Sequence, residues 1–197
     1  MAKIRAERIV IMKSATQSAL VFPETLSPAT QALLDRADAL CSRQGARLTQ
    51  QRREILGLIL SVNAPVGAYD LLEQMKTPDR RPAPPTVYRA LDFLLEHGLI
   101  HRIERLSAFV PCTHLLHDDH AAGCNHDHDQ DSICLHTAQF LICRSCKSVI
   151  EITNPSILDA VRTTCWEQGF VIQSSSIEIE GLCAHCAAHR KTPAHQH

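Results

Sequence analysis

Two pairs of cysteines carry the most specific chemical signal in this sequence. Two residues separate Cys143 from Cys146 and Cys183 from Cys186, and 36 residues lie between the pairs. A C-x-x-C spacing lets both sulfurs face one point, and two such pairs complete the closed tetrahedral S4 site that structural zinc prefers. Redox-active pairs and rubredoxin-type iron centres use the same residues, but redox pairs rarely come matched. The quartet therefore predicts a structural zinc that contributes directly to folding.

The other cysteines and histidines also favour metal binding over disulfides. The chain holds nine cysteines and twelve histidines, and eight of the cysteines follow residue 111. Stable disulfides are rare in the cytoplasm, and the N-terminus does not predict export, because Lys13 and Gln17 interrupt its apolar residues. No apolar stretch reaches the roughly 18 residues that a spanning helix needs. We therefore expect a cytoplasmic protein that binds metal and no membrane.

Charge divides the chain into two unlike halves. Residues 1–111 contain 15 Lys and Arg against 11 Asp and Glu, whereas residues 112–197 contain 5 against 10. A mildly basic half suits contact with phosphates, and an acidic, histidine-rich half suits divalent cations. A chance fluctuation in surface charge would give the same numbers, so charge alone does not decide the function.

The elements of the first half occur in the order of a winged helix. Apolar periodicity and turn residues predict helices at 28–41, 49–60, 69–75 and 85–97 and strands at 99–104 and 108–112. Thr49 is expected to cap the second helix. The helix at 85–97 has Pro85 at its first position and Gly98 just past its end, and it occupies the recognition position of the motif. A small helical bundle that binds no nucleic acid would show the same periodicity.

The second half predicts a smaller α/β domain. Strands at 137–142 and 147–153 flank the first cysteine pair, a helix runs from Asn154 to Gly169, and a strand at 170–180 leads into the second pair. The fold class is therefore α+β. The predicted divisions are an N-terminal tail at 1–28, the winged helix at 29–111, a hinge and His/Asp/Cys-rich loop at 112–136, the zinc-stapled domain at 137–190 and a tail at 191–197.

Several motifs together resemble the ferric uptake regulator (Fur) superfamily, and most closely its zinc uptake regulator (Zur) branch. They are R-L-T-Q-Q-R at 47–52, A-Y-D-L-L at 68–72, P-P-T-V-Y-R-A-L at 84–91, and the two cysteine pairs. The similarity covers roughly residues 30–190. The motif at 84–91 is highly specific, whereas the flanking helices are not.

The resemblance implies a regulatory zinc site that links the two halves. Its ligands would be His101, Cys112, His136 and Glu151. One thiolate, two imidazoles and a carboxylate suit Zn²⁺, while the thiolate argues against magnesium, calcium or manganese. Taken singly, each residue would be an ordinary surface or strand-end side chain. Iron-sensing and peroxide-sensing relatives carry a His-x-Asp-His-like cluster where this chain reads T-A-Q-F at 137–140, which favours zinc over iron.

The resemblance also implies a homodimer that binds an AT-rich palindromic operator when zinc is present and represses zinc-acquisition genes. The expected DNA-contacting residues are Arg47, Arg52, Tyr69, Thr86, Tyr88 and Arg89. Arg89 suits a guanine edge, and Arg47 or Arg52 suits a phosphate. The C-terminal domain would form the dimer. Binding of two dimers to one operator stays open.

The stretch between Cys112 and His136 is longer than in the family and rich in metal-binding side chains. Its candidates for an additional, weaker zinc site are His117, His120, Cys124, His126 and His128. The alternative is a disordered surface loop whose histidines are incidental. His117 or His120 could also replace His136 in the regulatory site.

Two other classes of function compete with a repressor. A zinc enzyme is not expected, because the chain has no H-E-x-x-H and no H-x-E paired with P-C-x-x-C. A cytoplasmic zinc buffer or chaperone would suit the histidine-rich loop but would not need a winged helix. A regulator of the same family that responds to another metal is the closer alternative.

Overall fold

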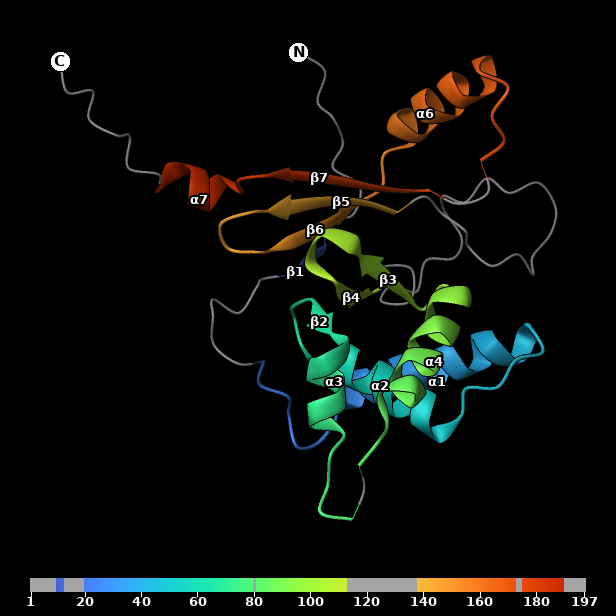
Figure 1. Ribbon diagram of the computed structural model, residues 1–197, viewed down its shortest axis with the longest axis vertical. Helices are drawn as coiled ribbons and strands as arrows, with labels where there is room; N and C mark the ends of the chain where they lie inside the picture. Colours follow the sequence, from blue (N-terminus) through green and yellow to red (C-terminus); the bar gives the residue numbers. More distant parts are fainter. Residues whose placement is uncertain (1–9, 13–19, 80, 113–137, 173–174, 190–197) are drawn as a thin grey trace. The chain divides into compact units, whose positions relative to one another are not determined.

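A computed structural model describes residues 10–12, 20–79, 81–112, 138–172 and 175–189, with only the backbone described at 10–12. The chain forms two compact units, which are described separately. One unit spans Ala19–Thr137, and the other combines Met1–Ser18 with Ala138–His197. Figure 1 shows their elements. No helix in the described ranges is long and apolar enough to cross a membrane.

The predicted helices of the first unit are confirmed. They are α1 (Pro28–Arg43), α2 (Gln50–Ser61), α3 (Ala68–Gln74) and α4 (Pro84–Glu96). Ser27 caps α1 by accepting a 3.1 Å hydrogen bond from the Thr30 N–H. Thr49 occupies the N-cap position of α2, as predicted, but its side chain makes no capping hydrogen bond. Gly98 ends α4 at φ 63°, the left-handed conformation that favours glycine.

The helices enclose one hydrophobic core. The face of α4 that contains Val87, Leu91 and Leu94 is buried and belongs to the same cluster as Ile55 and Ile59 of α2. Burial of such side chains is the main favourable term in folding. The core therefore fixes which side of α4 points inward and which side remains exposed.

A three-stranded sheet completes this unit as the predicted wing. Its order is β2 (Val66–Gly67), β4 (Ala108–Pro111) and β3 (Ile100–Ile103), all antiparallel. The hairpin between β3 and β4 contains a short 3₁₀ turn, Glu104–Leu106, and Ser107 at φ 48°. The two-residue strand β2 was not among the predicted strands. The order of helices and hairpin confirms the winged-helix prediction.

The second unit is built on a four-stranded sheet in the order β1-β6-β5-β7. Its elements are β1 (Val10–Met12), β5 (Ala138–Cys143), β6 (Val149–Ile152), α6 (Pro155–Glu167), β7 (Ser176–Gly181) and α7 (Ala184–Ala188). Strands β5 and β7 are parallel, whereas the other two pairings are antiparallel. The α+β class is confirmed.

The second unit differs from the predicted elements at three places. Residues 10–12 lie in the predicted N-terminal tail but form the edge strand β1 against β6. The strand predicted at 170–180 begins only at Ser176, where the pairing with β5 begins. Phe170 and Val171 alternate like strand residues but are 67% and 82% exposed. The short helix α7 was not predicted.

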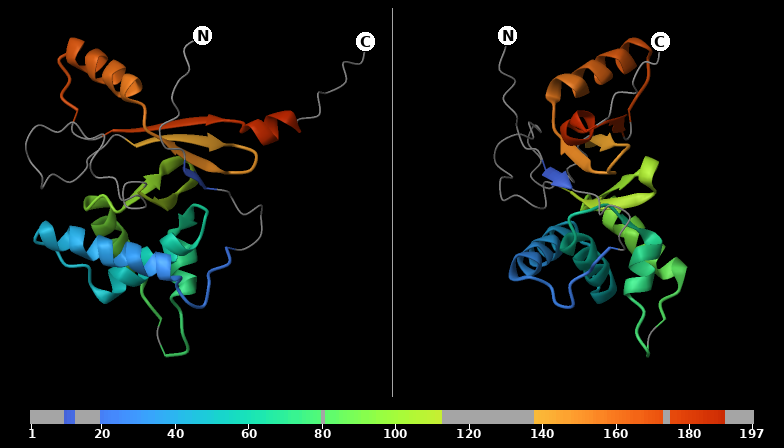
Figure 2. Two further views of the ribbon diagram at one scale, coloured as in Figure 1. Left: turned by 180° about the vertical axis from the view of Figure 1, so that it is seen from behind. Right: turned by 90° about the vertical axis from the view of Figure 1, so that its left-hand side faces the viewer.

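Helix α6 is poorly covered by the rest of its unit. None of its residues is buried, although Ile157, Leu158, Val161 and Trp166 are apolar. Trp166 is 81% exposed. Within this unit, α6 stands clear of the sheet in each view of Figures 1 and 2.

Truncation of a core residue of α4 should destabilise the first unit strongly. Leu94 is fully buried, and Leu→Ala changes at such sites cost about 2–5 kcal/mol. Asp92→Ala, on the exposed face of the same helix, should change the free energy of unfolding by less than about 0.5 kcal/mol. Urea titration followed by circular dichroism measures both variants. Equal losses for the two variants would contradict the assigned core face.

Candidate metal centre and nucleic-acid interface

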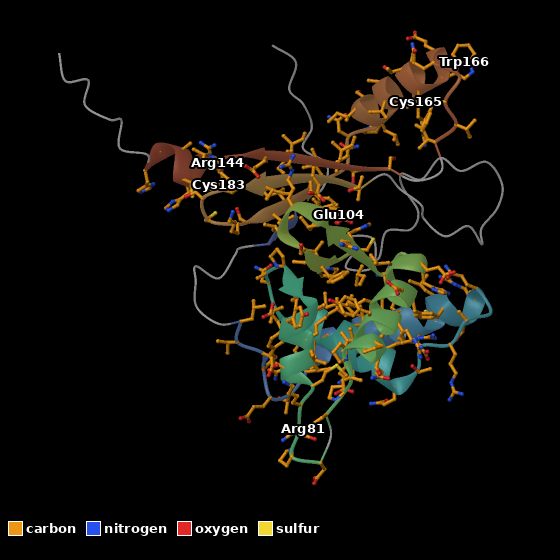
Figure 3. The ribbon with its side chains drawn as sticks, in the orientation of Figure 1. Arg81, Glu104, Arg144, Cys165, Trp166 and Cys183 are labelled. Carbon is orange, nitrogen blue, oxygen red and sulfur yellow. The ribbon has the colours of Figure 1, made fainter. Side chains whose placement is uncertain are left out.

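The parallel pairing of β5 and β7 brings the two cysteine pairs together. Cys143 is the last residue of β5 and lies opposite Gly181, the last residue of β7. Because the strands are parallel, their carboxyl ends meet at one edge of the sheet. The Arg144 N–H donates to the Gly181 carbonyl over 2.9 Å, which extends the pairing into the first cysteine turn. Figure 3 shows Arg144 and Cys183 side by side at this edge.

Each cysteine pair forms a tight turn that directs its sulfurs inward. In the first turn, the Lys147 N–H donates to the Cys143 carbonyl over 2.8 Å, and Lys147 adopts φ 57°. In the second, Cys183 is the N-cap of α7, and its sulfur accepts a 3.4 Å hydrogen bond from the Cys186 N–H. The Cys183 N–H in turn lies 3.3 Å from the Cys143 sulfur and donates to it. The second turn thus supports a sulfur of the first.

The four sulfurs have the spacing of a tetrahedral metal site. The Sγ atoms of Cys143, Cys146, Cys183 and Cys186 all lie within 4.8 Å of one another. The Cys146 and Cys183 sulfurs are 3.9 Å apart. A tetrahedral site with Zn–S bonds of about 2.3 Å requires S···S distances of about 3.8 Å. The predicted quartet therefore forms a cluster that fits zinc.

The pKa values of the cluster thiols are shifted by neighbouring hydrogen-bond donors, by burial and by one another. Burial raises the pKa of Cys143, but three backbone N–H groups donate to its sulfur and lower the pKa to about 6. The Ser148 hydroxyl, 3.2 Å from the Cys146 sulfur, lowers the pKa of Cys146. For Cys186, the Ser145 side chain opposes the shift, but neighbouring thiols raise the pKa to about 12. Four thiolates this close require a cation to coexist near neutral pH.

The two serines were not predicted to belong to the metal centre. They lie beside the first cysteine pair in the sequence, and both influence a cluster sulfur. Hydrogen-bond donors around a thiolate are the usual second layer of a metal site. A small hydroxyl residue inside or just after a C-x-x-C turn was the sequence signal that could have identified them.

Three of the four predicted regulatory ligands are described, and they lie in two separate units. His101 lies on β3, and Cys112 follows β4 with its N–H donating to the Leu99 carbonyl over 3.1 Å. His101 pairs with Val110, and residues two apart on a strand share a face. His101 and Cys112 are therefore diagonal neighbours on one face of the hairpin.

Glu151 belongs to the other unit. It lies on β6 opposite Phe140 and is only 3% exposed. A buried carboxylate is expensive unless cations or hydrogen-bond donors surround it. His136 lies outside the described residues, so the four-ligand site stays a prediction. The predicted additional ligands His117, His120, Cys124, His126 and His128 also lie outside the described residues.

Most of the predicted DNA-contacting side chains are accessible in the first unit. On α4, Tyr88 is 44% exposed and Arg89 is exposed, while Val87 before them and Ala90 after them are buried. Thr86 is half-buried in the first turn of α4. The amino-terminal half of the helix therefore presents one face outward, as a recognition helix must.

The remaining residues predicted to contact DNA differ in how accessible their side chains are. Tyr69, in the first turn of α3, is 73% exposed, and Arg47 is exposed. Arg52 is only half-buried and is engaged inside the unit: its guanidinium lies over the Phe93 ring. Neither the accessibility nor the packing tests the DNA contacts themselves, and they stay predictions.

The sequence of this chain matches the model of a known protein family. The model of the ferric uptake regulator family matches residues 43–180, which is well over half of the chain. The chain belongs to the ferric uptake regulator family. The matched range includes the winged helix from Arg43 onward and the first cysteine pair.

Three individual proteins that resemble this chain support the same family assignment. The zinc uptake regulation protein of Escherichia coli is 37% identical over 157 residues, which cover 80% of this chain and 82% of the relative. A zinc uptake regulator solved in complex with zinc and DNA is 36% identical to this chain. The match covers 82% of this chain and 97% of the regulator's chain, with a TM-score of 0.67. Holo XcZur is also 36% identical, covers 80% and 98%, and gives a TM-score of 0.63.

Loss of one sulfur should remove one metal ion and destabilise the second unit. We expect Cys183→Ser to lower the zinc content by one ion per chain, because a closed S4 site does not tolerate loss of a thiolate. Cys165→Ser is a matched control: Cys165 lies on α6, far from Cys183 in Figure 3 and outside the quartet. Elemental analysis of the purified variants measures the change. An unchanged zinc content in Cys183→Ser would contradict the assignment.

Proposed function

We propose that this protein is a zinc-responsive transcriptional repressor that binds operator DNA as a homodimer and controls zinc-uptake genes. The observation that carries the proposal is the 36% identity and TM-score of 0.67 to a zinc uptake regulator complexed with zinc and DNA, over 97% of that chain. This chain has the two features that such a function needs: a helix presented outward from a winged helix and a cluster of four sulfurs suited to zinc. We infer that it is a cytoplasmic regulator and not an enzyme.

In the proposed DNA complex, α4 enters the major groove. Arg89 would read a guanine edge with its bidentate guanidinium, while Tyr69 and Tyr88 contact neighbouring groups of the duplex. Thr86 and Arg47 would bind phosphates, which position the protein without reading sequence. The buried face of α4 supports this arrangement because Val87, Ala90 and Leu91 cannot turn outward without exposing the core.

In the proposed switch, zinc binds His101 and Cys112 of the hairpin together with His136 and Glu151. The first pair belongs to the DNA-binding unit, and Glu151 belongs to the other unit. A metal held by all four would restrict the orientations that the DNA-binding units sample. Zinc can increase DNA affinity only as far as it binds the restricted form more tightly than the unrestricted one. This coupling free energy is typically about 1–3 kcal/mol. Because the thiol and imidazoles must lose protons to bind zinc, repression should weaken as pH falls.

The second unit supports the proposed homodimer. Helix α6 has no buried residue; its Trp166 is 81% exposed, and Phe170, which follows the helix, is 67% exposed. Exposed apolar groups of this size mark interaction surfaces in soluble proteins. A second copy that covers α6 would supply the missing partner, and two-fold symmetry would match a palindromic operator. Two dimers could occupy one operator.

The function is tested by titrating free zinc against binding to an AT-rich palindromic duplex. The starting protein should hold only its structural zinc. Binding should switch on as free zinc rises, and iron or manganese at similar saturation should not replace it, because the mixed ligand set includes a thiolate. Fluorescence anisotropy of a labelled duplex measures the response. Zinc-independent binding would contradict the proposed switch, and the absence of binding under all conditions would contradict the repressor itself.

The proposed switch also predicts the behaviour of one buried cysteine. Cys112 is 1% exposed, and Cys112→Ser replaces a thiolate with a weaker zinc ligand. We expect the variant to lose the zinc-dependent gain in duplex affinity, about 5–150-fold for a coupling of this size, while its structural zinc content stays unchanged. Cys165→Ser should behave like the wild type. A Cys112→Ser protein with an unaltered zinc response would show that this thiol is no part of the regulatory site.

A further inference from the structure

Arg52 occupies an unusual place for a residue expected to bind DNA. It lies in the first turn of α2, and its guanidinium carbon is 3.5 Å from the centroid of the Phe93 ring on α4. At the same time, its Nη1 donates a 2.7 Å hydrogen bond to the Arg47 carbonyl. One face of the guanidinium therefore stacks on an aromatic ring, and one of its N–H donors is used within the unit.

Phe93 is itself held firmly in the unit. Its side chain is 8% exposed and belongs to the hydrophobic core. The ring of His97 stacks on it at a centroid distance of 3.9 Å and an interplanar angle of 27°. His97 Nδ1 also lies 2.9 Å from the Phe93 carbonyl. Arg52, Phe93 and His97 thus form a stacked cluster that joins the start of α2 to the end of α4.

The cluster extends to α1 as well. Burial raises the pKa of the Cys41 thiol, as does the charge of Asp38, and the positive charge of Arg52 lowers it in opposition. Cys41 lies on α1 and is fully buried. The direct contacts of Arg52 remain those to Phe93 and to the Arg47 carbonyl, and its charge acts on α1 in addition.

The geometry of α4 connects this cluster to the proposed base contact. Phe93 follows Arg89 by four residues, so the two side chains lie about one helical turn apart on the same helix. Rotation or sliding of α4 at Phe93 would displace Arg89 by a similar amount. A bidentate contact to a base edge depends on such placement.

From this arrangement we infer that Arg52 is a positioning residue: it fixes α4 through Phe93 and does not bind a DNA phosphate. The inference rests on the proposed function and replaces the phosphate role that the family resemblance implied for Arg52. Its neighbour in the same motif differs, because Arg47 is exposed and contributes only its backbone carbonyl to the cluster. The phosphate contact then belongs to Arg47.

Salt dependence separates a positioning arginine from a phosphate-binding one. Each phosphate contact contributes about 0.9 to the slope of log affinity against log salt. Affinities of zinc-loaded full-length wild type, Arg52→Gln and Arg47→Gln would be measured between about 50 and 200 mM salt. The probes are the AT-rich palindromic duplex on which the wild type responds to zinc, and a random-sequence duplex of equal length.

For Arg47→Gln, we expect the slope to fall by about 0.9 and the preference for the palindrome to stay unchanged. For Arg52→Gln, we expect an unchanged slope and a loss of about fivefold or more in that preference, because a misplaced Arg89 loses its base contact. Simple loss of stability would lower the active fraction but would not alter this ratio between two duplexes.

A second pair of variants keeps the inference falsifiable if Arg52→Gln folds poorly. Phe93→Leu should reproduce the loss of preference without touching any charge, and Arg52→Lys should not restore it, because a lysine cannot stack its plane on the ring. A slope that falls by about 0.9 in Arg52→Gln would overturn the inference, as would an unchanged preference in both Arg52→Gln and Phe93→Leu. If the wild type itself shows no zinc-dependent binding, the proposed function fails instead.

Discussion

The meeting of four sulfurs at the carboxyl ends of two parallel strands is the constraint on which the second unit depends. Parallel strands are joined by long connections, so β5 and β7 have no hairpin between them to hold their register. The sulfur cluster supplies that link at the edge where both strands end. The buried side chains that are described in this unit come from β5, from β6 and from the turn between them, because α6 buries none of its residues and β7 is largely exposed. Metal binding in such a unit is part of its folding free energy.

The first unit is stabilised in a different way. Its helices share one apolar core, and the described part of this unit holds no cluster of metal ligands comparable to the quartet. That core determines which face of α4 is available to a ligand. The cation–π contact between Arg52 and Phe93 then restrains the orientation of α4. Apolar packing alone would fix that orientation less specifically. The helix proposed to contact DNA and the sheet that carries the sulfur cluster thus belong to separate units of one chain.

Spacing and periodicity predicted much of this architecture because their causes are local. The helices followed from apolar residues at helical intervals, and the ends of α4 followed from Pro85 and Gly98. The sulfur quartet followed from two matched turns. Each of these signals lies within a few residues of the structure that it predicts.

Features that depend on distant partners could not be predicted in the same way. The edge strand β1 and the two-residue strand β2 exist only because β6 and β4 offer edges for pairing. Phe170 and Val171 alternate like a strand but have no pairing register with β5. The stacking of Arg52 on Phe93 joins residues of two helices, and a motif that resembles a family's DNA-binding segment gave no sign of it. The regulatory site stays a prediction because its ligands lie in both units and His136 lies outside the described residues.

We propose that this chain uses one zinc to fold and a different zinc to control DNA binding. Stepwise removal of zinc by chelators of rising affinity separates the two, with zinc per chain, circular dichroism and duplex binding followed on the same samples. We expect two steps: the first releases zinc and abolishes duplex binding while the fold persists, and the second releases the sulfur-bound zinc and unfolds the second unit. A single step in which zinc, DNA binding and structure are lost together would contradict it.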